Sequence, residues 1–463
     1  MLVRGCEYGL DVIGLVGERH MREHQSFREI HEELTERHGV LVSSRHVANL
    51  FRFYLVIVSA RTLSTEAVQA RLKAQGRLVL SVDAVRFDDV SPPMYVVREV
   101  CSGEILLAER VEKADTENLV KFLRQLESIK AAVVGIVTDK EHALISAVSL
   151  VFPGVPHQYC QTHFYGNLVK PMESDLATLG AGVDSVAKGV REVEQRLEHE
   201  KASPEELKLV KMVCDATRVI SKARGDKLFD PAPLKRFAKL RSLHSMIEVA
   251  LAQKGGTWPL LCWLLFKLAK LQEWAELADR LSKQVEVVRN MAHLLGVDNK
   301  GKTVERSVRK YVTQLEQELK KKLGDQPDDA PLAAFYQHVI AVTGRFWSGL
   351  FACYDIKELP ANNNDLESFF RSLKWHQRRA QGKKSTAGGP LESFGPLLVQ
   401  LWPQLKKRLE LQSLLQDLPP EDIKRARESL QALAEPARQR RSFIRDSDAQ
   451  IQDALSQWTK AQA

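Results

Sequence analysis

The chain has 463 residues, of which 44% are hydrophobic and 27% charged, and this balance excludes an intrinsically disordered protein. Its length predicts more than one domain, and its formal net charge of +8 favours a polyanionic partner without identifying one. The six scattered cysteines include no Cys-x-x-Cys pair, which favours free thiols over disulfides, and the longest apolar stretch, residues 258–269, is too short to span a bilayer. A reducing cytoplasm is therefore the expected location.

Residues 1–62 are predicted to be helical. Ser26 begins a capping-box pattern at the start of one helix, a His-Gly pair ends that helix, and Ser43 caps a second one. Two helices joined by a Gly-containing turn have the layout of a helix-turn-helix, whose second helix reads DNA. The residues that would then face the bases are Ser44, Arg45 and Asn49. An ordinary helical hairpin has the same pattern, so the helices alone leave both interpretations open.

The hydrophobic period then changes from helical to extended. A Val- and Leu-rich run over residues 77–87 predicts a strand buried on both faces, and two more strands follow, with a turn at Ser102-Gly103 between them. Two further strands alternate with helices up to residue 161. Three consecutive strands followed by helix, strand, helix and strand predict an α/β core with a mixed five-stranded sheet and flanking helices. This is the ribonuclease-H-like order, an antiparallel meander extended by parallel strands.

Helical periodicity replaces the strands after His163 for most of the remaining chain. Because the strand-rich core ends one element short of completion, the long helical block is interpreted as an insertion. A final catalytic helix and a charged helical tail, broken at Pro419-Pro420 and at Pro436, are predicted after it. The predicted domains are a helix-turn-helix-like region over 1–62, the first part of the core over 75–165, the insertion over 166–355, the final core helix over 356–390 and the tail over 391–463.

Three acidic residues are candidates for a metal site. Asp83 lies within the first buried strand, where an unpartnered carboxylate is costly, and Asp139 ends a parallel strand, where ligand sites gather. Glu367 lies on the polar face of an amphipathic helix, preceded by three asparagines that predict a capped turn positioning that helix. Carboxylate oxygens are the ligands that Mg²⁺ prefers. Turn or cap roles for the aspartates, and a Glu–Arg pair on a solvated helix for Glu367, are the alternatives.

Taken together, these features resemble the DDE transposases, in particular the bacterial insertion-sequence and Mutator-like families. The resemblance is carried by Asp83, by Asp139 in a Thr-Asp turn, by the Cys160-x-x-His163 pair and by an NN-x-x-E-x-x-x-R-x-x-K helix around Glu367, over roughly residues 75–385. It implies a ribonuclease-H-like catalytic core in which the three acids bind Mg²⁺ or Mn²⁺, with two ions expected. It also implies cleavage at transposon ends and joining of the 3′-OH to target DNA.

Other residues admit more than one role. Cys160 and His163 have the ligand types and spacing of half a zinc site, but they also suit structural packing, and the resemblance implies a signature near the active site. Trp258 and Trp263 are candidates for stacking a DNA base, with burial in a core as the alternative. A basic run predicts phosphate contacts or a plain solvated face. Its residues are Arg371, Lys374, Arg378, Arg379, Lys383 and Lys384.

The partners follow from the resemblance. It implies double-stranded DNA, both the terminal inverted repeats and the target, a homodimer or higher oligomer assembled on that DNA in the nucleoid, and no membrane. Members of these families often carry a longer N-terminal region than this chain does, which bears on end recognition. Two other classes share the pattern: a catalytically inactive, domesticated DNA-binding protein, and a structure-specific DNA nuclease or resolvase on the same core.

Overall fold

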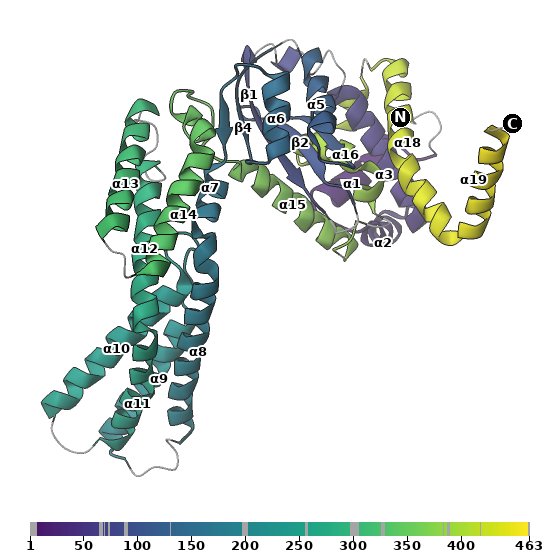
Figure 1. Cartoon of the computed structure of the whole chain (residues 1–463). Helices are drawn as coiled ribbons and strands as arrows, with labels where there is room; N and C mark the ends of the chain where they lie inside the picture. The colour runs from purple at the N-terminus through teal and green to yellow at the C-terminus, as the bar shows by residue number, and fades with distance from the viewer. Residues whose placement is uncertain are drawn as a thin grey trace. The chain divides into compact units, whose positions relative to one another are not determined.

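The computed structural model describes most of the chain, and its helices and strands are labelled in Figure 1. The described residues are 7–63, 68, 70–72, 75–87, 91–129, 131–196, 202–254, 258–296, 305–325, 329–382, 384–386, 389–416 and 418–461. The chain divides into two compact units. Met1–Cys160 together with Ile356–Ala463 form the first unit, and Gln161–Asp355 form the second.

The first unit contains a mixed five-stranded sheet with the strand order β3-β2-β1-β4-β5. The strands are β1 (Arg77–Val85), β2 (Met94–Glu99), β3 (Ile105–Arg110), β4 (Ala132–Thr138) and β5 (His157–Tyr159). β2 pairs with β1 and with β3 in antiparallel fashion, whereas β4 pairs with β1 and with β5 in parallel. The predicted mixed sheet, an antiparallel meander extended by parallel strands, is confirmed.

The helices of the first unit come from both ends of its sequence. They are α1 (Leu10–Met21), α2 (Phe27–His38), α3 (Ser44–Thr62), α5 (Thr116–Arg124), α6 (His142–Val151), α15 (Asn364–Gln381), α16 (Pro390–Leu405), α17 (Leu411–Leu415), α18 (Pro420–Arg445) and α19 (Ser447–Ala461). α5 and α6 are the two helices that cross over between strands, as the sequence predicts.

One face of the sheet is closed by α5 and α6. Leu80 and Val82 of β1 pack with Phe122 of α5 and Leu144 of α6 in one buried hydrophobic cluster. Because successive residues of a strand point to opposite faces, the even-numbered residues of β1 face these helices. The odd-numbered residues face the other way, and Val85 belongs to a second buried cluster with residues of α15 and α16.

The N-terminal helices form as their capping residues predict. The side chain of Ser26 accepts a hydrogen bond from the Glu29 amide at the start of α2, and the Glu29 carboxylate accepts one from the Ser26 amide. Gly39 ends α2 with a φ of 64°, a left-handed conformation that favours glycine. The side chain of Ser43 caps α3. Most of α3 is buried against α1, α2, α17 and α18, so it is a central helix of this unit.

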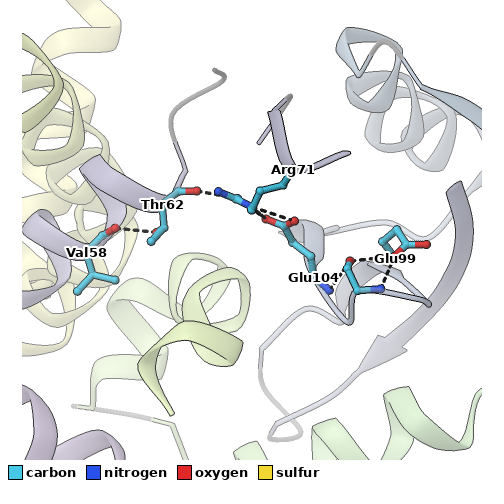
Figure 2. A network of polar contacts seen from close by, with 6 residues as sticks. Val58, Thr62, Arg71, Glu99 and Glu104 are labelled. Carbon is cyan, nitrogen blue, oxygen red and sulfur yellow. Dashed lines mark hydrogen bonds and ion pairs between the residues drawn. The ribbon is translucent and has the colours of Figure 1, made fainter. Parts of the chain in front are cut away.

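A polar network joins the end of α3 to the hairpin between β2 and β3 (Figure 2). The Arg71 guanidinium donates to the Thr62 carbonyl at 2.9 Å and forms an ion pair with the Glu104 carboxylate. At the other side of the hairpin turn, the buried Glu99 carboxylate accepts hydrogen bonds from the amide and the hydroxyl of Ser102 at 2.6 and 2.8 Å. The network therefore ties the N-terminal helices to the sheet through side chains.

The C-terminal part of the first unit differs from the predicted charged tail. α16 is buried along most of its length and belongs to the core cluster, although it contains Pro396 and Pro403. The sequence also predicts a break at Pro436, which is wrong, because α18 continues through this residue. A proline inside a helix removes one backbone hydrogen bond, and buried neighbours such as Leu430 and Ala437 compensate for it by packing.

The described part of the second unit is helical apart from an isolated bridge at residues 226 and 230. Its helices are α7 (Gln161–Val169), α8 (Glu173–Arg196), α9 (Pro204–Ser221), α10 (Ala232–Lys254), α11 (Pro259–Ala269), α12 (Ala275–Leu294), α13 (Glu305–Asp325) and α14 (Ala330–Phe346). Glu206 of α9 is buried, and its carboxylate accepts hydrogen bonds from the amides of Leu260 and Leu261 at 2.8 and 3.1 Å. One acidic side chain thus satisfies the first turn of α11.

Two expectations from composition are tested by the described residues. The five cysteines placed there, Cys101, Cys160, Cys214, Cys262 and Cys353, are all free thiols, as predicted. None of the described helices has the length and apolar character needed to cross a membrane.

Candidate active site

Two aspartates lie near the carboxyl ends of neighbouring parallel strands, Asp83 within β1 and Asp139 directly after β4. The last residue pair between β1 and β4 is Val82 opposite Thr138, and Asp83 and Asp139 are the next residues on each side. Adjacent strands are ~4.8 Å apart, so the backbones at these two positions are close. Asp83 is only 8% exposed, and its Oδ1 accepts a hydrogen bond from the Ala84 amide at 2.7 Å. The predicted adjacency of the two strands is therefore confirmed.

A buried asparagine fastens the start of α15 to β1 beside Asp83. Asn363, which is 1% exposed, accepts a hydrogen bond from the Ser81 hydroxyl at 2.9 Å and donates one from Nδ2 to the Val82 carbonyl at 3.1 Å. Its amide also donates to Cys160 Sγ at 3.4 Å. Asn363 occupies the position before α15, but its side chain makes no capping hydrogen bond because β1 already uses both of its polar atoms. The predicted capped turn forms through a different asparagine, since Asn362 Oδ1 accepts a hydrogen bond from the Asn364 amide at 3.1 Å, while Asn363 positions the helix.

Glu367 lies one helical turn beyond Asn363. Its amide donates to the Asn363 carbonyl at 3.0 Å, and residues four apart lie on the same side of a helix. The side of α15 that Asn363 fixes against β1 therefore also carries Glu367, which is half-buried. Asp365 differs from it, since its side chain is 86% exposed and lies 4.0 Å from Arg98. Of these two neighbouring acids, Glu367 is thus the partly buried one and Asp365 the exposed one.

Cys160 connects three segments at this end of the sheet. It follows β5, is fully buried, and donates from its amide to the Thr138 carbonyl at the end of β4 at 2.8 Å. Its Sγ accepts the Asn363 amide and lies within 4.8 Å of an Asp139 carboxylate oxygen. His163 comes three residues later, in the first turn of α7. The contacts of Cys160 are those of a residue that packs beside Asp139 and the start of α15.

A cluster of histidines holds the far half of α15. His376 Nδ1 lies 2.9 Å from His24 Nδ1, and Lys406 Nζ lies 3.2 Å from His24 Nε2. Burial, followed by repulsion from the neighbouring histidines and Lys406, lowers the pKa of His376 to about 2. Burial also lowers the pKa values of His20 and His24 to about 4. These rings are therefore neutral at pH 7, and they join α15 to α1 and α16.

The basic residues predicted to contact phosphates lie mostly on the surface. Those exposed are Arg371, Arg378, Arg379 and Lys384, and Lys374 is half-buried. Arg379 forms an ion pair with Glu29 of α2 at 3.1 Å, so this guanidinium is engaged within the unit. Lys383 lies outside the described residues. The remaining cations on α15 form a basic surface next to Glu367.

The residues predicted to read DNA bases lie in the first two turns of α3. Ser44 and Arg45 are exposed, and Asn49 is half-buried, with its Oδ1 accepting a hydrogen bond from Arg52 at 3.3 Å. The second half of the helix, from Tyr54 onward, is almost wholly buried. The accessible side chains of α3 thus lie mainly in its first half, up to Phe53.

The two tryptophans predicted to stack on a base belong to the second unit. Trp258 precedes α11 and is half-buried. Trp263 lies within α11, with the Arg196 guanidinium 4.9 Å and the Lys267 ammonium 5.6 Å from its ring centre. The ring of Trp263 is therefore half-buried and in contact with two cations, so it differs from the fully buried Leu264 beside it.

The arrangement defines an α/β protein with acidic residues at the carboxyl ends of two parallel strands and on a helix fastened to one of them. Residues 106–167 match the family model of the MULE transposase domain. The matched segment runs from β3 to α7 and includes Asp139, Cys160 and His163. These residues are therefore similar to a MULE transposase domain, in agreement with the predicted resemblance.

The other comparisons add little to this match. No curated protein sequence matches the chain. Among solved structures, the chain is similar to the Drosophila P element transposase strand transfer complex, at 11% sequence identity, over 90% of this chain and 94% of that chain. The TM-score of 0.34 is too low to establish a common fold.

Proposed function

We propose that this protein is a DNA transposase with a ribonuclease-H-like core, whose catalytic acids are Asp83, Asp139 and Glu367. The observation that supports the proposal is how these positions are held: Asp83 and Asp139 directly follow the last paired residues of β1 and β4, and Asn363, one helical turn before Glu367, bonds to β1. The proposed chemistry is cleavage of phosphodiester bonds at transposon ends and transfer of the 3′-OH to target DNA.

The donor set fits a divalent metal ion. Asp83, Asp139 and Glu367 offer hard carboxylate oxygens, which Mg²⁺ and Mn²⁺ prefer, and they would hold one or two such ions. A bound ion of this kind activates a nucleophilic oxygen and stabilises a leaving one. The chain's own contribution is positional, because the Asn363 hydrogen bonds keep the helix that bears Glu367 in place.

Side chains along α15 suit the DNA backbone. Arg371 and Lys374 follow Glu367 by four and seven residues, a spacing that places all three on one side of a helix. We expect these cations, together with Arg378, to hold phosphates next to the acids. Arg379 is already paired with Glu29 and would contribute less.

The remaining parts of the chain have proposed roles around this core. The helical unit of residues 161–355 would be an insertion before the last core helix, with Trp258 and Trp263 as candidates for stacking a DNA base. The exposed start of α3, with Arg45 and Asn49, would contact DNA as in a helix-turn-helix. A homodimer or higher oligomer on the terminal repeats is the proposed assembly.

The test is nicking of supercoiled plasmid DNA by the full chain, with Mn²⁺ as the probe ion. Asp83→Asn, Asp139→Asn and Glu367→Gln should each lower the nicking rate by about 10²-fold or more, because each removes a group that acts in the transition state. Binding to a duplex oligonucleotide should change by less than about twofold. The matched control is Asp365→Asn, which removes the exposed neighbouring acid and should leave nicking unchanged.

Different outcomes separate the alternatives. A triad variant that nicks like the wild type excludes that residue from the catalytic set. A chain that binds DNA and never nicks it is a DNA-binding protein derived from a transposase. A chain that nicks DNA but does not join a labelled 3′-OH end to a target plasmid is a nuclease.

A further inference from the structure

α3 and α18 form the walls of a groove within the first unit. The two helices run beside each other and are in contact (Figure 1). The groove between them has a volume of about 1700 Å³, and its lining includes Phe53 of α3 and Phe394 of α16. The groove therefore lies between the exposed part of α3 and α18, which the sequence predicts only as part of a charged tail.

Arginine dominates the charge of this groove. The six arginines in its lining are Arg45 and Arg52 of α3 and Arg427, Arg438, Arg441 and Arg445 of α18. Glu428 and Glu435 are the acidic residues, so six positive charges face two negative ones. Lysine does not occur among the described lining residues. We call this surface the arginine groove.

Most of these guanidinium groups have no carboxylate partner among the described residues. Arg438 lies 3.3 Å from the Glu435 carboxylate, and Arg441 lies 4.0 Å from Glu392. The other four arginines form no ion pair with any described residue; they are Arg45, Arg52, Arg427 and Arg445. The protein thus holds several uncompensated cations on facing walls.

The positive charges in the arginine groove repel one another. Burial, and then the positive charges of Arg441, Arg438 and Arg45, lower the pKa of Arg52. Facing cations on two packed helices lower stability unless an anion lies between them. The geometry of the groove therefore favours a polyanion that contacts both walls at once.

We propose that the arginine groove binds the sugar-phosphate backbone of double-stranded DNA, and that α18 contributes to this binding together with α3. The inference rests on the proposed function, since a transposase must hold DNA outside the cleavage site as well as in it. Guanidinium groups bind phosphate oxygens through two parallel hydrogen bonds, which lysine cannot do. The exclusive use of arginine in the groove is consistent with this recognition.

The neutral residues of the groove fit the same ligand. Asn49, Gln431 and Gln439 line it beside the arginines and offer amide donors for phosphate and sugar oxygens. Each DNA strand presents one negative charge per ~3.4 Å of helix axis, so one backbone strand offers an unbroken row of phosphates to the cations on both walls. An acidic peptide would need an unbroken run of carboxylates to do the same.

The experiment measures binding of the full chain to a mixed-sequence duplex oligonucleotide by fluorescence anisotropy at several salt concentrations. The test variant is Arg427→Gln combined with Arg445→Gln, because both residues are exposed and neither forms an ion pair with a described residue. We expect about tenfold weaker binding, and a slope of log K against log salt that is smaller by about 1.8, or ~0.9 for each lost phosphate contact.

The matched control is Arg425→Gln combined with Arg440→Gln, which removes the same charge from α18 outside the groove lining. Equal losses in the test and control variants would overturn the proposal, because they would show a general charge effect. Stronger competition by poly-glutamate than by unlabelled duplex of equal charge would overturn it too. If the glutamine variant does not fold, Arg427→Lys with Arg445→Lys replaces it, and unchanged affinity there contradicts recognition by guanidinium groups.

The same samples distinguish this proposal from the proposed function. Suppose that the wild-type chain nicks DNA with Mn²⁺ and that the groove variant binds DNA as the wild type does. The groove proposal is then wrong, and the proposed transposase activity is unaffected. If instead the wild-type chain never nicks DNA but binds it through Arg427 and Arg445, the groove proposal holds and the catalytic proposal is wrong.

Discussion

The two faces of the central sheet are built in different ways. On the α5–α6 side, Leu80 and Val82 pack among apolar side chains from helices that are close in sequence. On the α15 side, Ser81 and Asp83 of the same strand are buried among polar partners, and the covering helix comes from a distant part of the chain. The apolar face supplies stability without polar specificity. The α15 face has polar contacts in place of part of this apolar packing, and it is the face that carries the candidate catalytic residue Asp83.

The largest expected effect on stability comes from the apolar face. Leu80→Ala should lower the free energy of unfolding by ~2–5 kcal/mol, because it leaves a cavity in a fully buried cluster. Asp83→Asn, three positions along the same strand, should change it by less than about 1 kcal/mol, since the side chain keeps its shape and its Oδ1 acceptor. Urea unfolding measures the free energy of unfolding of both variants. A larger loss for Asp83→Asn than for Leu80→Ala would contradict the inference that the apolar face contributes more to stability.

The next effect concerns the fastening of α15. Asn363→Ala should cost ~1–3 kcal/mol, because the buried Val82 carbonyl and Ser81 hydroxyl lose their partner. The variant should also lower the rate of DNA nicking, with DNA binding unchanged, if Asn363 positions Glu367.

Ser81→Ala is the matched partner for a double-mutant cycle with Asn363→Ala. Their contact at 2.9 Å should give a coupling energy of at least ~0.5 kcal/mol, whereas additive effects would show that the hydrogen bond does not fasten the helix.

The effect that is smallest at pH 7 is a dependence of stability on pH. The pKa of His376 is lowered to about 2 and that of His20 to about 4, from an ordinary value of 6.5. As pH falls below 6.5, the unfolded chain binds protons that the folded chain does not, so stability decreases by up to ~1.4 kcal/mol per pH unit for each histidine. The groups facing His376 are His20, His24 and Lys406.

His376→Leu should therefore reduce the loss of thermal stability between pH 7 and pH 5. The matched control is His244→Leu, in the second unit, where the ring is close to Glu248. An equal pH dependence in wild type and His376→Leu would show that the cluster on α15 is not the cause.

Local signals in the sequence account for much of the fold. The capping box at Ser26, the cap at Ser43 and the strand run around Asp83 depend on residues within one or two turns, and all of them form as predicted. The order of strands and helices then leaves few topologies open, because parallel connections need crossover helices. The sheet was therefore predictable.

The partners of Asn363 and the burial of α16 were not predictable in the same way. Asn363 bonds to Ser81, which lies 282 positions earlier, and no local pattern distinguishes this use of an asparagine from a helix cap. The signal present in the sequence is a serine within an otherwise apolar buried strand. In α16, two prolines indicate a break, but Pro396 follows a kink at Phe394 and so begins a new first turn, where a missing N–H costs little.

The fastening of α15 to β1 also has a consequence for biosynthesis. All five strands precede α15 by about 200 residues, so at roughly 5–20 residues per second the sheet can form some 10–40 s before that helix leaves the ribosome. During this interval the aspartates lack the glutamate that would complete the proposed site. Nascent and prematurely terminated chains would then be unable to cut DNA, and only translation through residue 367 would produce a competent enzyme.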